Sequence, residues 1–159
     1  MKLKNIAGIL LIGIFVFSCK AQNKPTLSTK TESQKSLLFP KGEKITNAHF
    51  TGTAYLQMLI AADSLNPTSV GNVTFEPGAR TKWHLHPGGQ ILLATDGVGY
   101  YQEKGQPKKI LRKGDAIKCP PNIQHWHGAS IDTHFVQVAI TNTKNGVPVW
   151  LEAVTDEEY

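Results

Sequence analysis

The sequence predicts one all-β domain, folded as a small barrel or sandwich, behind an export signal and a polar tether. Short segments rich in β-branched and aromatic residues recur along residues 45–159 and are separated by turn residues, a pattern typical of such folds. No long stretch in this region has the periodicity of an amphipathic helix. Two histidine clusters lie where strands are expected, and they indicate where the function resides.

Turn residues divide the domain into nine expected strands. Gly, Pro, Asn and Asp gather between the apolar segments, for example at Pro87-Gly88-Gly89 and Asp96-Gly97. The expected strands are 53–60, 71–75, 81–86, 91–95, 99–102, 108–111, 116–119, 124–127 and 134–141. The acidic end of the chain, residues 155–159, is expected to form a short turn or a tail.

Residues 1–19 have the pattern of a lipoprotein-type signal peptide. Lys2 and Lys4 precede a short apolar run over residues 6–17, and Cys19 follows almost at once. We expect Cys19 to be the lipidation site, so that the protein is exported and lipid-anchored to a bacterial membrane, facing the periplasm or the cell surface. The alternatives are an ordinary cleaved signal and an uncleaved anchor.

Residues 20–44 are predicted to be a flexible tether, because they are polar and poor in apolar side chains. They hold six lysines and two glutamates, whereas residues 45–159 hold nine basic and ten acidic residues. The domain is therefore nearly neutral, and no basic face indicates a nucleic-acid partner. If Cys19 is lipidated, Cys119 has no disulfide partner, and a buried apolar role is favoured for it over a catalytic thiol.

The two histidine clusters indicate a metal site. Side chains alternate along a strand, so His84 and His86 face one spot, and Gln90 follows them after a turn. His125, on another expected strand, can supply a fourth ligand. This arrangement predicts one mononuclear metal site inside a small barrel.

The spacing of these residues resembles the cupin superfamily. The first motif, 78–97, reads Gly78, five residues, His84-x-His86, three residues, Gln90, six residues and Gly97. The second, 114–129, reads Gly114, five residues, Pro120-x-Asn122, two residues and His125. The resemblance implies a single jelly-roll β-barrel domain over residues 45–159. The metal ligands that it implies are His84, His86, Gln90 and His125.

Gln90 departs from the usual pattern, in which a carboxylate stands at this position. A neutral amide leaves the ligand set without a protein anion, which makes a bound metal a stronger Lewis acid. Imidazole and amide ligands suit manganese, iron, cobalt, nickel or zinc. The alternative is a barrel that has lost its metal and serves only as a scaffold.

Three further segments, 73–81, 125–129 and 154–159, resemble one subgroup of small cupins. This subgroup includes manganese-dependent bacterial hydroxynitrile lyases and the cupin modules found beside carboxymuconolactone-decarboxylase-like domains. The resemblance implies manganese as the metal and places His127 in the pocket, where we expect it to act as general acid/base; the alternative is a supporting hydrogen bond. Where the lyases carry another pocket histidine, this chain has Gln137.

Other side chains are weaker candidates. Strand alternation allows only one of Tyr100 and Tyr101 to face the cavity, and it favours Gln137 over His134 as the inward residue of the last strand. Arg80 and Lys82 are either guides for an anionic substrate or solvated charges. Trp83 and Trp126 are expected to pack on the outer face, and His49 is expected at the surface.

These features predict a metal-dependent cupin enzyme that acts on a small oxygenated or carbonyl-type molecule. The most concrete version is hydroxynitrile-lyase-like C–C cleavage, with the metal as Lewis acid and His127 as acid/base. The alternatives are an Fe(II)-dependent dioxygenase, a uronate-linearising cupin and a non-enzymatic lipoprotein that binds a small ligand. By analogy, residues 45–60 are expected to mediate a homodimer.

Overall fold

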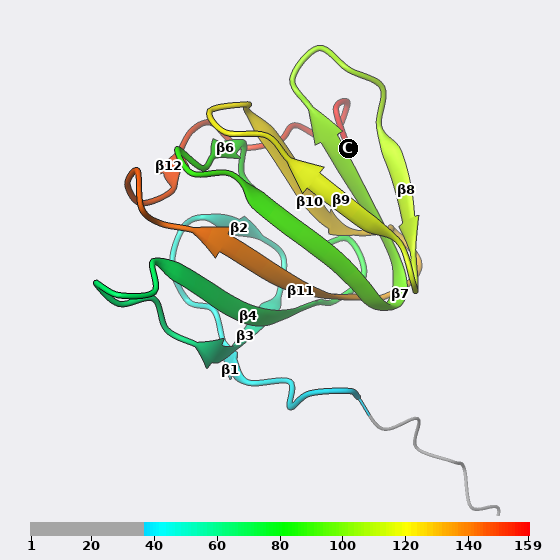
Figure 1. Ribbon diagram of the computed structural model, residues 1–159. Helices are drawn as coiled ribbons and strands as arrows, with labels where there is room; N and C mark the ends of the chain where they lie inside the picture. Colours follow the sequence, from blue (N-terminus) through cyan, green and yellow to red (C-terminus); the bar gives the residue numbers. More distant parts are fainter. Residues whose placement is uncertain (1–36) are drawn as a thin grey trace, which may run out of the picture. The chain divides into compact units, whose positions relative to one another are not determined.

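The computed structural model describes residues 37–159, which form strands, turns and loops (Figure 1). The predicted signal peptide, its lipidation site Cys19 and residues 20–36 of the predicted tether lie outside the described residues. Among residues 37–159 no helix is long and apolar enough to cross a membrane. The all-β fold class is confirmed.

The described residues form twelve strands, most of them short. They are β1 (Glu43–Lys44), β2 (Phe50–Thr51), β3 (Ala54–Ile60), β4 (Thr68–Phe75), β5 (Arg80–Thr81), β6 (His84–Leu85), β7 (Gln90–Glu103), β8 (Lys109–Arg112), β9 (Ala116–Cys119), β10 (His125–Ala129), β11 (Phe135–Asn142) and β12 (Val149–Trp150).

The strands form two sheets that share β7. The first sheet pairs β1, β3, β4, β11, the first half of β7 and β9, whereas the second contains β2, β5, β10, the second half of β7, β8, β6 and β12. All these pairs are antiparallel. Side chains from the inner faces of both sheets meet in one interior, as in a jelly-roll barrel.

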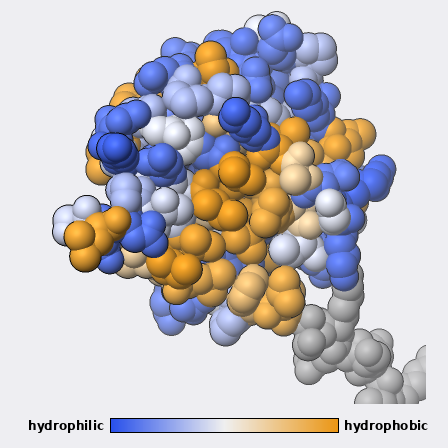
Figure 2. All heavy atoms as spheres, viewed as in Figure 1, coloured by the Kyte–Doolittle hydropathy of each residue, from blue (hydrophilic) through white to orange (hydrophobic). Residues whose placement is uncertain are grey.

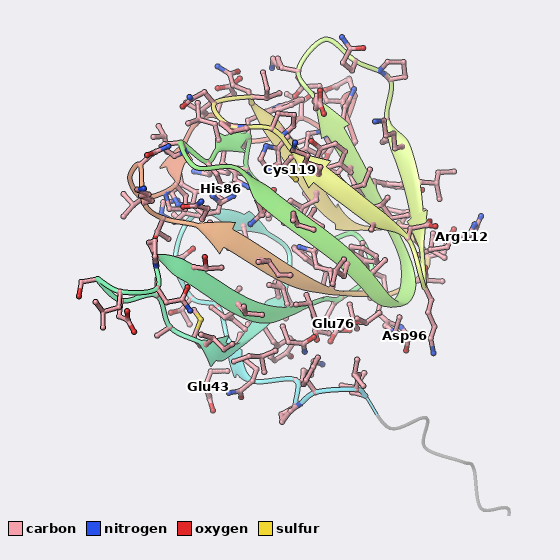
Figure 3. All side chains as sticks on the ribbon, viewed as in Figure 1. Glu43, Glu76, His86, Asp96, Arg112 and Cys119 are labelled. Carbon is pink, nitrogen blue, oxygen red and sulfur yellow. The ribbon has the colours of Figure 1, made fainter. Side chains whose placement is uncertain are left out.

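The interior is apolar at one end and polar at the other. Phe75, Leu92, Tyr101 and Phe135 are almost completely buried in the apolar part. The histidines lie toward the end where β6 and β12 are found, and Figure 3 shows His86 there, far from Asp96 at the opposite end.

A second apolar cluster lies outside the second sheet, under the C-terminal residues. Trp83 and Trp126 pack there with Val154, Leu151 and Tyr159, so the expected packing role of the two tryptophans is confirmed. The chain end forms a turn, and the Tyr159 hydroxyl donates a hydrogen bond to the Ala129 carbonyl oxygen at 2.7 Å.

The division of β7 into two strands, 91–95 and 99–102, is wrong. Gly97 takes a φ of 72°, which bends the chain without ending it. Pairing continues through the bend, because Gly97 pairs with Phe135 of β11 and the next residue, Val98, pairs with Arg112 of β8. The expected turn at Asp96-Gly97 is therefore the point at which one strand passes from the first sheet to the second.

Other elements also differ from the sequence-based expectation. The expected strand 81–86 is divided into β5 and β6, and the short strands β1, β2 and β12 were not expected at all. The chain joins the first sheet at β1, just before residue 45, where the domain was expected to begin. The Pro40 carbonyl oxygen also accepts a hydrogen bond from the buried Asn72 side chain at 3.1 Å.

The outer face of the first sheet is apolar over part of its area. Ile60, Ile91 and Leu93 are among its exposed side chains. Figure 2 shows hydrophobic side chains gathered over the region of β4, β7 and β11.

Candidate metal centre

Four histidines converge at the polar end of the barrel. His84 lies on β6, and His86 is the first residue after this strand. His125 and His127 lie on β10, which pairs with β6 through His125 and His84. All four are almost completely buried. The ring centroid of His84 lies 5.1 Å from that of His86 and 4.4 Å from that of His125. The two sequence motifs therefore meet in space.

The tightest group of ring nitrogens includes His127. One nitrogen each of His84, His125 and His127 lies within 4.8 Å of the other two. His86 is not a member of this group, although its ring centroid is 5.5 Å from that of His125. His84 and His125 belong both to the expected ligands and to this group. The third histidine is His86 among the expected ligands and His127 in this group.

Backbone carbonyl groups orient the rings of His84 and His125. The Nδ1 of His84 lies 2.9 Å from the Lys82 oxygen, and the Nδ1 of His125 lies 2.9 Å from the Ile123 oxygen. A carbonyl oxygen only accepts, so Nδ1 of each ring carries the proton and donates it. The lone pair of each ring is then on Nε2, where it can bind a metal.

Gln90 is oriented in a similar way by Thr141. The Gln90 amide nitrogen donates to the Thr141 hydroxyl oxygen at 2.9 Å, and both residues are buried. This bond leaves the amide oxygen of Gln90 without a hydrogen-bond partner. That oxygen is therefore the atom that Gln90 can offer as a ligand.

The donor set fits a divalent transition metal. Within the described residues, buried polar atoms that lack a partner include both ring nitrogens of His86, the Gln90 amide oxygen and the Nε2 atoms of His125 and His127. Such atoms are rare in folded proteins and costly to bury. Imidazole nitrogens and an amide oxygen gathered in one interior would be satisfied together by a metal ion.

Burial keeps the four rings neutral. Desolvation lowers the pKa of His86 to about 4, with a further lowering by the nearby His125 and an opposing effect of Gln90. Desolvation also lowers the pKa of His84 and His127 well below the usual value, and the neighbouring histidines add to this effect. The pKa of His125 is also lowered, mainly by desolvation. Neutral imidazoles are the form that binds metal ions.

Aromatic side chains form the wall around the rings. The Trp150 indole lies against His84, and His49 stacks on Trp150 at a centroid distance of 4.4 Å. Phe75 meets the His127 ring edge-on at 5.8 Å. The sequence interpretation missed Trp150, and it placed His49 at the surface, although His49 is half-buried by this stack.

Tyr101, rather than Tyr100, faces the interior. It is completely buried, and its ring centroid lies 5.5 Å from that of His125. Its hydroxyl donates to the Glu103 carboxylate at 3.0 Å, and Glu103 pairs across the strands with His125. An acidic side chain therefore lies next to the site, and the sequence interpretation missed it because the expected strand 99–102 ended one residue before Glu103.

Two of the weaker candidates lie away from the site. The Arg80 side chain is buried against the C-terminal turn, where it donates to the Val154 carbonyl oxygen at 3.2 Å and to the Asp156 carboxylate at 2.6 Å. Neither alternative for Arg80, a guide for an anionic substrate or a solvated charge, agrees with the structure, because its guanidinium is buried and bonded to C-terminal residues. His134 lies at the opposite end of the barrel, 3.3 Å from Asp96. The favoured inward residue, Gln137, is completely buried inside the barrel.

Two cavities are lined by residues that contact the histidines or belong to the expected ligand set. One has a volume of about 450 Å³, and its lining includes Phe50, Leu56, Val73 and Trp150. The other has a volume of about 350 Å³ and reaches Gln90. Because Trp150 lies on His84, the larger cavity shares a wall with the candidate metal site.

The all-β fold defines a barrel of the cupin type, whose buried histidine cluster could hold a divalent metal, and comparisons with known proteins agree on the fold family. Residues 71–140 match the Cupin domain family (Cupin_2). The chain is 42% identical over 111 residues to a protein named (R)-mandelonitrile lyase from Granulicella tundricola, a match that covers 69% of this chain and 85% of that protein. The chain therefore belongs to the cupin superfamily, and within it the chain resembles bacterial hydroxynitrile lyases.

Solved structures support the same assignment. A cupin-like protein from Thermotoga maritima is 48% identical, with a TM-score of 0.73, and the match covers 77% of this chain and 93% of that one. A cupin 2 conserved barrel domain protein from Rhodopseudomonas palustris is 17% identical, with a TM-score of 0.59, and covers 73% of this chain and 78% of that one. The second similarity concerns the fold alone.

Proposed function

We propose that this protein is a metal-dependent cupin lyase that cleaves a C–C bond in a small hydroxynitrile. The observation that carries the proposal is the convergence of four buried, neutral histidines and the free amide oxygen of Gln90 in one interior. The similarity to the (R)-mandelonitrile lyase supports this reaction class over others that cupins perform.

The residues that would hold the metal are His84, His86, Gln90 and His125. A divalent transition metal bound there supplies Lewis-acid polarisation of a substrate oxygen or nitrogen. We propose manganese first, and iron, zinc, nickel or cobalt as alternatives. Because Gln90 is uncharged, the four ligands leave the full metal charge to attract an electron-rich group.

His127 is the residue that we assign to proton exchange with the substrate hydroxyl. One of its ring nitrogens lies within 4.8 Å of nitrogens of His84 and His125, and its Nε2 lacks a hydrogen-bond partner. Phe75 packs edge-on against the His127 ring, which is almost completely buried, and burial strengthens hydrogen bonds made there. The larger cavity, with Phe50, Leu56 and Val73 in its wall, would hold the apolar part of the substrate.

The test uses the purified full chain, loaded separately with Mn²⁺, Fe²⁺, Co²⁺, Ni²⁺ and Zn²⁺. We expect at least one form to release benzaldehyde from (R)-mandelonitrile. Oxygen consumption with the iron form would indicate a dioxygenase instead. Tight ligand binding without turnover in every form would favour a non-enzymatic binding protein.

The exported, lipid-anchored state remains a separate proposal that rests on residues 1–19. Mass spectrometry of protein from a bacterial membrane fraction should find Cys19 as an acylated N-terminus, and Cys19→Ser should release the protein from the membrane. Membrane association that persists in this variant would contradict the proposal.

A further inference from the structure

Gln137 connects the two sheets at the histidine cluster. It lies on β11 in the first sheet, and its amide nitrogen is 3.1 Å from Nδ1 of His127 on β10 in the second sheet. Both side chains are buried, with 0% of Gln137 and 4% of His127 exposed. This contact therefore forms in the barrel interior, away from competing water.

The partner of Nδ1 distinguishes His127 from the two carbonyl-bound histidines. His84 and His125 each present Nδ1 to a backbone oxygen, which requires a proton on Nδ1. His127 instead presents Nδ1 to an amide N–H donor, which requires a lone pair on Nδ1 and places the proton of the neutral ring on Nε2. His127 thus adopts the opposite tautomer.

This difference decides what His127 offers to the cluster. One of its ring nitrogens lies within 4.8 Å of nitrogens of His84 and His125, a distance that would allow the three to share one metal ion. An Nε2 that carries a proton has no lone pair for a metal, whereas it can donate a hydrogen bond to an oxygen or nitrogen of a bound molecule. Proximity alone would allow His127 to become a ligand, and the tautomer prevents it.

We propose that Gln137 is a positioning residue that keeps the proton of neutral His127 on Nε2 while no substrate is bound and thereby keeps this histidine out of the metal's coordination sphere. The proposal deepens the function proposed above and rests on it for the acid/base role of His127. The amide of Gln137 can also turn and accept from Nδ1–H through its partnerless Oε1. In that orientation Nε2 carries the lone pair and can take up the substrate's hydroxyl proton, which gives an imidazolium whose Nδ1–H still donates to Oε1, and Nε2 then returns this proton to the released cyanide.

The experiment reads the tautomer directly by long-range ¹H–¹⁵N NMR of the full chain with ¹⁵N-labelled histidine, loaded with diamagnetic Zn²⁺. His127→Ala identifies the His127 signals. We expect a proton on Nε2 in the wild type, a mixture of tautomers in Gln137→Leu and a proton on Nδ1 in Gln137→Glu, whose carboxylate only accepts. Thr141→Val, which removes the hydrogen bond to Gln90 instead, should leave the His127 tautomer unchanged.

A metal titration provides the second measurement. Gln137→Glu frees a lone pair on Nε2 of His127, so its Zn²⁺ affinity should rise by about 10- to 100-fold, the range typical of outer partners of metal ligands. A wild-type proton on Nδ1, or an unchanged pure Nε2–H tautomer in Gln137→Leu, would overturn the proposal. Neither measurement uses substrate, so a failure of the lyase assay alone would count against the proposed reaction and not against the role of Gln137.

Discussion

Trp150 covers the imidazole of His84, with a distance of 4.7 Å between the ring centroids and an angle of 30° between the planes. The backbone brings the two together, because β12 pairs with β6 through Trp150 and His84. The last strand of the chain therefore forms part of the wall of the candidate metal site, far in sequence from both motifs.

This contact makes Trp150 a reporter of metal binding. Co²⁺ bound near His84 should quench the fluorescence of Trp150 strongly, since the indole touches a ligand ring. Trp150→Phe keeps an aromatic wall and should lose most of the quenching, which a fluorescence titration measures. Trp126→Phe is the matched control, because Trp126 packs in the outer cluster. Quenching that survives in Trp150→Phe and disappears in Trp126→Phe would place the metal elsewhere.

The periodic features of the chain could be predicted from the sequence. The alternation of His84 and His86, and the inward direction of Gln137 in the last long strand, follow from the two-residue repeat of a β-strand. β9 was predicted with its observed ends, since turn residues lie on both sides of it. Local rules therefore located the histidines and most of the strands.

The features that were missed depend on contacts between distant segments. Trp150 belongs to a strand of two residues, too short for any periodic pattern, and only its pairing with β6 brings it to His84. Glu103 comes next to His125 because β7 continues past its bend at Gly97. Arg80 was placed next to an expected strand, but its guanidinium binds Val154 and Asp156 near the end of the chain. Nothing in the sequence around Arg80 predicts this distant contact.

Loss of His84 and loss of His127 should have different effects on the metal. His84→Ala removes an expected ligand and should lower metal affinity by more than about 100-fold, the upper range for outer partners. His127→Ala should retain the metal and lose turnover. Elemental analysis and a benzaldehyde-release assay of both variants check this. Full metal occupancy in His84→Ala would refute the ligand assignment, whereas unchanged turnover in His127→Ala would refute the acid/base assignment.

Gly97 should be intolerant of any side chain. A Cβ there would lie 1.9 Å from the His134 carbonyl oxygen, and φ is also positive. Gly97→Ala should therefore cost about 1–2 kcal/mol for the left-handed backbone and a further ~1–3 kcal/mol for the overlap. Gly105→Ala is the control, because φ is 77° and no atom lies within 4 Å of the added Cβ. Urea unfolding should show that Gly97→Ala is less stable than Gly105→Ala. Equal stabilities of the two variants would contradict the argument.

Cys119 should be chemically inert in the folded protein. Burial raises the pKa of its thiol to about 12; a contact with Tyr101 opposes this shift and Glu103 adds to it. The reactive thiolate is therefore scarce at neutral pH. In a Cys19→Ser chain, iodoacetamide should label Cys119 slowly under native conditions and rapidly in denaturant, as measured by mass spectrometry. Rapid native labelling would revive the alternative of a functional thiol.

Arg80 should stabilise the fold mainly through its buried contacts and only weakly through its ion pair. Its side chain is 8% exposed, whereas that of Asp156 is 92% exposed. Asp156→Asn should therefore cost less than about 1 kcal/mol, as for other solvated pairs.

Arg80→Met keeps much of the side-chain volume but removes the bond to the Val154 carbonyl oxygen and the contact with the Tyr159 ring, 4.4 Å from the guanidinium carbon. A hydrogen bond from a charged group is worth about 1.5–3 kcal/mol, so this variant should be clearly less stable than Asp156→Asn. A double-mutant cycle by urea unfolding should give a coupling energy between Arg80 and Asp156 below about 1 kcal/mol. A larger coupling would mean that the ion pair, and not the buried contacts, anchors the C-terminal turn to the barrel.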